Sequence, residues 1–345
     1  MKVSDAKARA ARWVRHTGMN MPTVVGAYWS GSVNWLPDTA QLPVSSDVDI
    51  CLVVDDEPVP DNLGKFRHDG VVLDVSFLPG ELLRRPERVL ADYHLAGSFH
   101  HGGIIADPAG ILATAHRTVA AGYHRREWVL RRCEHVRDRI VDWAGRFDPT
   151  APLAQRVIDW VFPTGVVCHL LLVAGLQNPT VRRRYVLARD LLTDHGRADF
   201  HRTLLEQLGC HDLSSGRVAY HLGGLAAAFD AAAATTAPGS PWSRDLAAAA
   251  RPIVIDGSAE LIAADLHREA VFWMVATWAK CLAGLEATAD PAVVDRHRDG
   301  LWELLTDLAV EDDEALRDRA AAVTTFLPHA WRVALDIVSA DPRID

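Results

Sequence analysis

The spacing of the apolar residues changes near residue 120, and this change constrains the fold more than any other feature of the sequence. Before that point, short runs rich in β-branched and aromatic residues alternate with polar segments that contain Pro and Gly. Four such runs occupy residues 23–29, 47–54, 70–78 and 102–110. They predict a small sheet, and apolar residues at helical spacing over 4–17 predict a helix beside it.

After residue 120, apolar residues recur at every third and fourth position over long segments, which is typical of helices packed on a core. These segments are 124–145, 153–176, 181–195, 197–208, 258–285, 291–309 and 312–338. A further helix is expected from residue 226, followed by a loop near 236–242. The sequence therefore predicts an α+β fold, in which a small mixed-sheet domain (1–120) precedes an all-helical domain (121–345).

Composition and cysteine usage indicate the cellular compartment of the protein. Hydrophobic residues make up 49% of the chain and charged residues 23%, as in globular proteins with a full core. No run approaches the roughly 20 uninterrupted apolar residues of a membrane helix, and the N-terminus lacks the apolar core of a signal peptide. The five cysteines are scattered and form no C-x-x-C pair, so we expect neither a disulfide framework nor a zinc site. We therefore expect a cytoplasmic protein with no membrane contact.

The formal net charge of −9 restricts the possible partners. Proteins that hold long nucleic acids usually present a basic face, because neutralising phosphates supplies most of the affinity. No long basic run occurs in this chain, so long nucleic acid is not the expected partner. A nucleoside triphosphate needs only a few local cations and is compatible with this charge.

Two carboxylates stand at the start of the second predicted strand. Asp47 and Asp49 are two residues apart, so their side chains point to one face, while Val48, Ile50 and the following alternate residues point to the core. Neighbouring carboxylates repel each other unless a cation or water lies between them. Mg²⁺ binds through one or two carboxylates together with substrate phosphates. The pair therefore suits a metal site, although an exposed acidic strand end has the same pattern.

Two further features point to the same chemistry. Gly31 and Ser32 follow the first predicted strand, where glycine lets backbone N–H groups approach a phosphate and a serine hydroxyl can donate to it. Asp74 lies in the middle of the apolar run VVLDVSFL, where a buried, unpaired carboxylate would be costly. Asp74 either faces solvent from an edge strand or joins Asp47 and Asp49 in a cluster of three carboxylates.

Taken together, these features resemble the nucleotidyltransferases of the DNA polymerase β superfamily, especially the small-molecule branch with the aminoglycoside and lincosamide adenylyltransferases. The matching positions are Gly31, Ser32, Ser46, Asp47, Asp49 and Asp74. The segment 104–110 is similar to the strand and turn that often close such a domain. The resemblance covers roughly residues 20–120. The sequence departs from the family at Val33, Asn34 and Trp35, where an arginine is often found, and in a longer loop between Ser32 and Asp47.

The resemblance implies transfer of a nucleoside monophosphate from a nucleoside triphosphate, with ATP as the expected donor, to a hydroxyl of a small molecule such as an antibiotic. Asp47 and Asp49 would hold one or two Mg²⁺ ions, and Asp74 would be either a further metal ligand or the general base. Gly31, Ser32 and Ser46 would bind the nucleotide. Alternatives are a toxin-type nucleotidyltransferase that modifies a protein or a tRNA, and an inactive nucleotide-binding scaffold protein. The presence of all three acids favours an enzyme.

Additional positive charge is needed near a triphosphate. Arg182, Arg183 and Arg184 follow a predicted helix start in the second domain, and we expect them to contribute to nucleotide binding. A solvated, charged helix face would give the same run of arginines. In the first domain, Lys65 and Arg67 are second-choice candidates for this positive charge.

Overall fold

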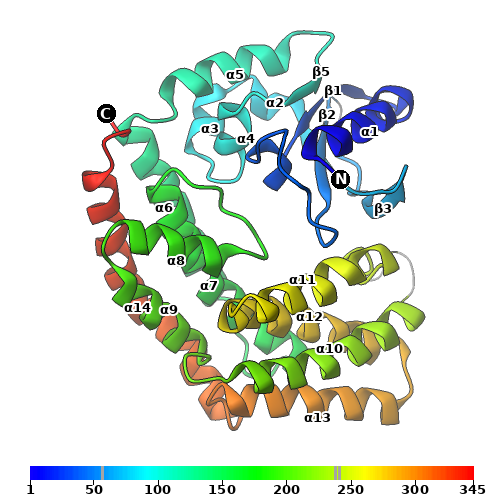
Figure 1. Cartoon of the computed structure of the whole chain (residues 1–345), viewed down its shortest axis with the longest axis vertical. Helices are drawn as coiled ribbons and strands as arrows, with labels where there is room; N and C mark the ends of the chain where they lie inside the picture. The colour runs from blue at the N-terminus through cyan, green and yellow to red at the C-terminus, as the bar shows by residue number, and fades with distance from the viewer. Residues whose placement is uncertain (56–57, 237–238, 240–241) are drawn as a thin grey trace. The chain divides into compact units, whose positions relative to one another are not determined.

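The computed structural model describes residues 1–55, 58–236, 239 and 242–345. The chain divides into two compact units, one formed by residues 1–135 with 342–345 and the other by residues 136–341. The first unit holds the sheet and the second is helical, which confirms the predicted α+β fold (Figure 1). The division predicted at residue 120 falls inside helix α5 (Ile111–Gly122).

A mixed sheet forms the centre of the first unit. Its strands are β1 (Val24–Trp29), β2 (Val48–Val54), β3 (Gly64–His68), β4 (Val71–Pro79) and β5 (Ile104–Ala106). They lie in the order β3-β4-β2-β1-β5. Strands β2 and β4 run parallel, whereas the other neighbouring pairs are antiparallel. The two strands that carry the predicted acids therefore lie side by side within the sheet.

Alternating side chains of β2 pack on two different helical layers. Val48, Ile50 and Leu52 pack on helix α1 (Val3–His16), as their spacing predicts. Cys51 and Val53 pack instead on the helices that follow β4 in the chain. Those helices are α2 (Gly80–Leu83), α3 (Pro86–Ala91), α4 (Leu95–His100) and α5. Both faces of the sheet are covered, and this fixes the direction of each side chain along β2.

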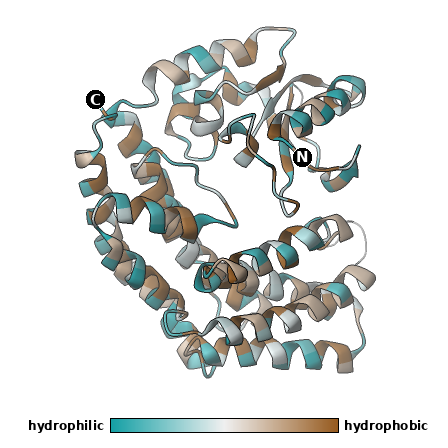
Figure 2. Ribbon diagram, in the orientation of Figure 1, coloured by the Kyte–Doolittle hydropathy of each residue, from teal (hydrophilic) through white to brown (hydrophobic). Residues whose placement is uncertain are grey.

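The second unit is built from helices, and the chain enters it through α6, which runs across the division. The helices are α6 (Arg126–Ala144), α7 (Leu153–Ala174), α8 (Arg184–Asp194), α9 (Ala198–Leu208), α10 (Ser215–Thr235), α11 (Arg251–Ala263), α12 (His267–Thr288), α13 (Pro291–Asp307) and α14 (Asp313–Ala340). Many of them carry both hydrophilic and hydrophobic residues along their length (Figure 2).

Two of the predicted helices differ most clearly from the observed ones. The segment 258–285 contains two helices, α11 and α12, because the chain takes a positive φ of 58° at Asp265. Helix α10 begins at Ser215 and not near residue 226, and the Ser214 hydroxyl caps it by accepting the Arg217 N–H at 3.2 Å. Residues 237, 238, 240 and 241 of the predicted loop near 236–242 lie outside the described residues.

The two most apolar helices lie in the core of the helical unit. Helices α7 and α12 are each long and apolar enough to span a membrane, but 89% and 78% of their most apolar windows are buried in the protein. Such burial is typical of the core helices of a soluble protein. All five cysteines are free and buried, so none contributes a disulfide.

Candidate metal centre

Three carboxylates converge on one face of the sheet. Asp47 directly precedes β2, Asp49 is the second residue of β2, and Asp74 lies opposite Asp49 in the parallel β2–β4 ladder. Because Leu73 and Val75 pack on the α1 side, Asp74 points to the other face, as Asp49 does. One oxygen from each of the three carboxylates can be chosen so that all lie within 4.8 Å of one another. The structure therefore brings together the three acids that the sequence singled out.

Strand β4 is an interior strand, which decides between the two settings considered for Asp74. It is paired with β2 on one side and with β3 on the other. Asp74 thus does not face solvent from a sheet edge, and its side chain is 30% exposed, compared with 18% for Asp47. Hydrogen-bonded ladders on both sides hold the backbone that carries it.

Lys65 lies against the acids; the sequence indicated it only as a second-choice cation for the triphosphate and not as a partner of the carboxylates. It lies opposite Asp74 in the β3–β4 hairpin. Its ammonium donates to Oδ2 of Asp47 at 2.5 Å and to Oδ2 of Asp74. The side chain is only 17% exposed, so the protein, and not bulk solvent, surrounds this cation. The acid cluster of Asp47, Asp49 and Asp74 therefore contains a lysine as its counter-ion.

A turn signal could have revealed the strand that carries Lys65. Strand β3 has the sequence GKFRH, in which one large apolar side chain stands among cations, so the segment looks like a loop. Asp69 and Gly70 follow it with φ values of 52° and 78°. An Asp-Gly pair with positive φ is typical of a two-residue β-hairpin turn. Reading that pair as a hairpin would have placed Lys65 beside Asp74.

The electrostatics of the cluster follow from its burial. Burial of Asp49, and then the negative charge of Asp47, raise the pKa of the Asp49 carboxyl to about 8, although Lys65 acts in the opposite direction. For Lys65, burial by itself would lower the pKa of the ammonium. The carboxylates of Asp47 and Asp74 outweigh that effect and hold the Lys65 pKa above its ordinary value. The lysine therefore stays charged, and ionisation of Asp49 works against folding.

Gly31 brings the backbone directly against the Asp49 carboxylate. Its backbone adopts φ 59° and ψ −155°, a conformation that is almost restricted to glycine. A Cβ atom at this position would lie 1.9 Å from Oδ2 of Asp49. The neighbouring Ser30 N–H donates to the Asp49 carbonyl oxygen at 3.1 Å. Ser32 follows in the 3₁₀ turn η2 (Ser32–Asn34), which packs against β2.

Val33, Asn34 and Trp35, which stand where the family often has an arginine, hold this turn in place. Val33 is fully buried, and the Asn34 amide donates to the Ser98 carbonyl oxygen at 2.9 Å. The Trp35 ring packs on His101, with 4.1 Å between ring centroids. The turn is therefore held on α4 by packing, and these three residues bring no positive charge to the acids.

The remaining nucleotide-binding candidate of the first unit lies at the end of the long loop. Ser46 is half-buried and directly precedes Asp47. Its backbone N–H donates to the Pro43 carbonyl oxygen at 3.0 Å. This hydrogen bond closes a turn that leads the chain into β2, so Ser46 helps to fix the start of the acidic strand.

The three arginines of the second unit have different surroundings. Arg184 is 2% exposed, its guanidinium lies 4.1 Å from the centre of the Phe272 ring, and its Nε donates to the Val181 carbonyl oxygen at 2.8 Å. Arg184 therefore packs inside the helical unit. Arg182 is half-buried and Arg183 is exposed, and both precede α8, which begins at Arg184 and not before the three arginines as predicted. A role of these side chains in nucleotide binding stays a prediction.

The acid cluster has suitable donors for a hard divalent cation. Carboxylate oxygens are the preferred protein ligands of Mg²⁺, and two oxygens on one Mg²⁺ lie at most about 4.2 Å apart. The separations of up to 4.8 Å among the acid oxygens are close to this limit. A small side-chain rotation would bring all three oxygens onto one ion, and the present spacing also suits a pair of ions. The residues therefore fit the predicted metal.

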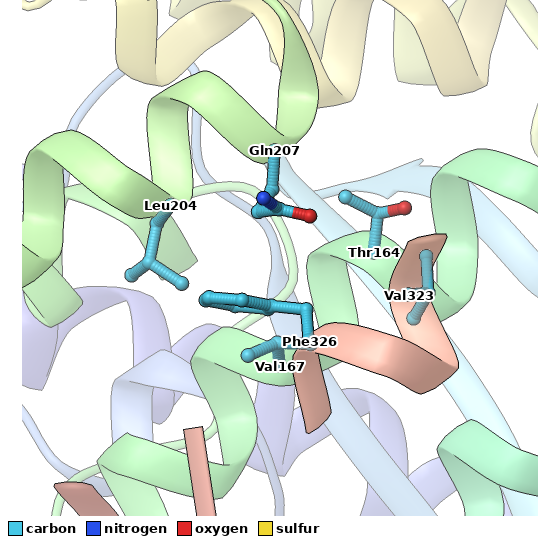
Figure 3. Close-up of a pocket in the computed structure, with 6 residues that line it drawn as sticks. All are labelled: Thr164, Val167, Leu204, Gln207, Val323 and Phe326. Carbon is cyan, nitrogen blue, oxygen red and sulfur yellow. The ribbon is translucent and has the colours of Figure 1, made fainter. Parts of the chain in front are cut away.

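A hollow in the helical unit does not provide a ligand site. It is lined by Thr164, Val167, Leu204, Gln207, Val323 and Phe326 from α7, α9 and α14. Figure 3 shows the Phe326 ring pointing toward Leu204 across it. The hollow encloses no space large enough for a water molecule, so it cannot hold an acceptor.

Comparison with protein-family models found no match, and no curated protein matched the chain. The functional interpretation therefore depends on the geometry of the acid cluster and on the resemblance of its sequence pattern.

Proposed function

We propose that the protein is a nucleotidyltransferase that moves a nucleoside monophosphate from a nucleoside triphosphate, ATP being the first choice, to a hydroxyl of a small molecule. One observation carries this proposal. Carboxylates from two adjacent parallel strands meet within 4.8 Å on one face of the sheet. Such a cluster suits Mg²⁺ and a triphosphate together, because Mg²⁺ usually keeps part of its coordination shell for substrate phosphates.

Each residue of the cluster has a defined part in the proposed reaction. Asp47, Asp49 and Asp74 bind one or two Mg²⁺ ions. When bound, these ions neutralise the triphosphate and stabilise the oxygen that leaves. Gly31 lets the backbone approach the site, since any side chain there would meet Asp49. The Ser32 hydroxyl donates to an oxygen of the β- or γ-phosphate.

The transfer step needs positioning more than covalent chemistry from the protein. The acceptor oxygen forms a bond to the α-phosphorus while the bond from that phosphorus to the bridging oxygen of the β-phosphate breaks. Pyrophosphate leaves with the electron pair of the broken bond. The proton of the acceptor hydroxyl passes to the Asp74 oxygen that does not hold a metal ion. The Asp74 side chain is 30% exposed and thus more accessible than that of Asp47 at 18%.

A small acceptor suits the charge of the protein better than a nucleic acid does. The net charge of −9 would repel the phosphate backbone of a tRNA at long range. We propose an antibiotic or a biosynthetic intermediate with a free hydroxyl, modified in the cytoplasm. Modification of an antibiotic in this way would give resistance to it.

A screen of donors and acceptors tests the proposal. The purified protein is incubated with Mg²⁺, each of the common nucleoside triphosphates, and a panel of hydroxyl-bearing antibiotics, nucleosides, tRNA and proteins. Mass spectrometry should find a small-molecule product heavier by one nucleoside monophosphate. A modified tRNA or protein would identify the toxin-type alternative. Mg²⁺-dependent triphosphate binding without any product would identify the scaffold alternative, and tight binding in EDTA would contradict the metal assignment.

Asp49→Asn is the informative variant for this screen. Losing one metal ligand should lower the transfer rate about 10³-fold or more, because the ions supply several kcal/mol of transition-state stabilisation. Asp55→Asn is a matched control. Asp55 follows the other end of β2, is 43% exposed and forms an ion pair with Arg84. The control should keep wild-type turnover, and wild-type turnover of Asp49→Asn would contradict the proposal.

A further inference from the structure

Lys65 occupies the position at which a cation would bind two of the three acids. Its ammonium contacts Oδ2 of Asp47 and Oδ2 of Asp74, and its side chain is 17% exposed. These two carboxylates therefore have a side chain of the protein as their counter-ion. The chain carries a permanent counter-cation at its candidate metal centre.

The ammonium would compete with a divalent cation for Oδ2 of Asp47 and Oδ2 of Asp74. A metal ion held by Asp47 and Asp74 would lie within a few ångströms of the Lys65 ammonium if that group kept its place. Two like charges so close together in a poorly solvated site repel each other strongly. The ammonium must therefore withdraw before a metal ion is bound by these carboxylates.

The backbone limits how Lys65 can withdraw. Lys65 is held opposite Asp74 in the β3–β4 ladder, so its Cα atom is fixed and only the flexible four-carbon side chain can move. A charge with so little exposure needs a new anionic partner near the one it leaves. A triphosphate bound on the same face through the metal provides that partner.

We propose that Lys65 keeps free divalent ions off the acid cluster and moves from the carboxylates to the phosphates when a metal–triphosphate complex enters. The first part concerns metal binding alone, and the second rests on the proposed nucleotidyltransferase function. Metal binding would thereby depend on the nucleotide. Lys65 would be a specificity-determining residue that selects the complex of metal and triphosphate over the free metal.

The decisive experiment measures binding of Mn²⁺ alone, by calorimetry or electron paramagnetic resonance, to the full-length protein. Lys65→Met removes the charge and keeps a long, flexible side chain. It should bind Mn²⁺ at least about tenfold more tightly than the wild type, because the competing ammonium is gone. Lys65→Arg keeps the charge and should bind free Mn²⁺ as weakly as the wild type.

Arg67→Met is the control for the change in net charge. Arg67 lies two residues along β3, opposite Val72, and is exposed. It forms no ion pair with Asp47, Asp49 or Asp74 in the described part of the chain. Its replacement should change Mn²⁺ affinity by no more than about twofold, since an exposed charge is screened by solvent.

Two results would overturn the role of Lys65 toward free metal. One is Mn²⁺ affinity of Lys65→Met that equals or falls below that of the wild type. The other is a Lys65→Met protein that stays unfolded, by circular dichroism, even with saturating Mn²⁺. In that case the metal cannot replace the ammonium, so the two cations do not share a position.

A second measurement adds a non-hydrolysable ATP analogue together with Mn²⁺. Lys65→Met should bind the analogue at least about tenfold more weakly than the wild type, because a phosphate contact is lost. Equal affinity would overturn the movement of Lys65 to the phosphates. If the wild type does not bind the analogue at all, the proposed function fails, while the Mn²⁺ comparison still decides whether Lys65 excludes free metal.

Discussion

Replacing Gly31 by alanine tests whether the acid cluster depends on close approach of the backbone. The alanine Cβ would lie 1.9 Å from Oδ2 of Asp49, whereas real Cβ atoms stay at least 3.0 Å from such atoms. The Asp49 carboxylate must therefore shift by about 1 Å or more, and a displacement of about 1 Å can lower a reaction rate about 100-fold. We expect nucleotide transfer by Gly31→Ala to fall at least about 100-fold.

The backbone conformation of Gly31 adds a cost in stability. A non-glycine residue at φ 59° and ψ −155° costs of order 1–3 kcal/mol. Asp49 can relieve the steric clash by turning away from the cluster, so the free energy of unfolding should fall by little more than this. Urea denaturation followed by circular dichroism measures that free energy.

Gly110→Ala is the matched control. Gly110 also has a positive φ, 72°, but no atom lies within 4 Å of the position that its Cβ would take. The substitution should cost about 1–2 kcal/mol of stability through the backbone alone and leave transfer and metal binding unchanged. The reasoning would be refuted if Gly31→Ala lost stability as Gly110→Ala does and kept wild-type transfer.

Two other predictions concern packing and pH. In helix α10, Gly224→Ala would place a Cβ 2.5 Å from the Trp278 ring and should destabilise the protein by about 1–3 kcal/mol. The Cβ of Gly223→Ala would meet nothing within 4 Å, so this variant should stabilise the protein by about 0.5–1 kcal/mol. Urea denaturation measures both changes. Burial, and after it the neighbouring histidines and Arg132, lower the pKa of His100 to about 4. Neutral His100 thus favours the folded state, so its contribution to stability is complete above the ordinary histidine pKa of about 6.5 and is lost as pH falls from there toward 4. His100→Phe keeps the stacking on Tyr123 and should reduce this loss in melting curves between pH 7 and 4, and an unchanged slope would contradict the assignment.

The acids on one strand could be predicted from the sequence, because the information is local. Alternation along residues 47–54 places Asp47 and Asp49 opposite Val48 and Ile50, and the structure has the same arrangement. The pairing of Asp49 with Asp74 is not local. It requires β4 to lie parallel to β2 with β3 outside it, and no pattern within a strand specifies which strand is its neighbour.

Helix α10 shows a second limit of local patterns. Gly223 and Gly224 lie inside it, and two adjacent glycines favour an interruption of a helix. Packing decides otherwise, because Gly224 is the position at which α10 meets the Trp278 ring of α12. The glycine that weakens the helix in isolation is the residue that permits its tertiary contact.

The acid cluster combines a carboxyl whose ionisation opposes folding with a backbone conformation that only glycine adopts readily. Ionisation of Asp49 opposes folding, since its pKa is raised to about 8, and Gly31 adopts a conformation that other residues avoid. Two packed helical layers hold the sheet that brings these groups together. An exposed acidic strand end would need neither the close approach of Gly31 nor a lysine with 17% exposure as its counter-ion. Local arrangements that oppose folding while the rest of the domain is well packed concentrate at functional sites. The close approach at Gly31 and the enclosed Lys65 therefore support the site proposed above for a divalent cation and its phosphates.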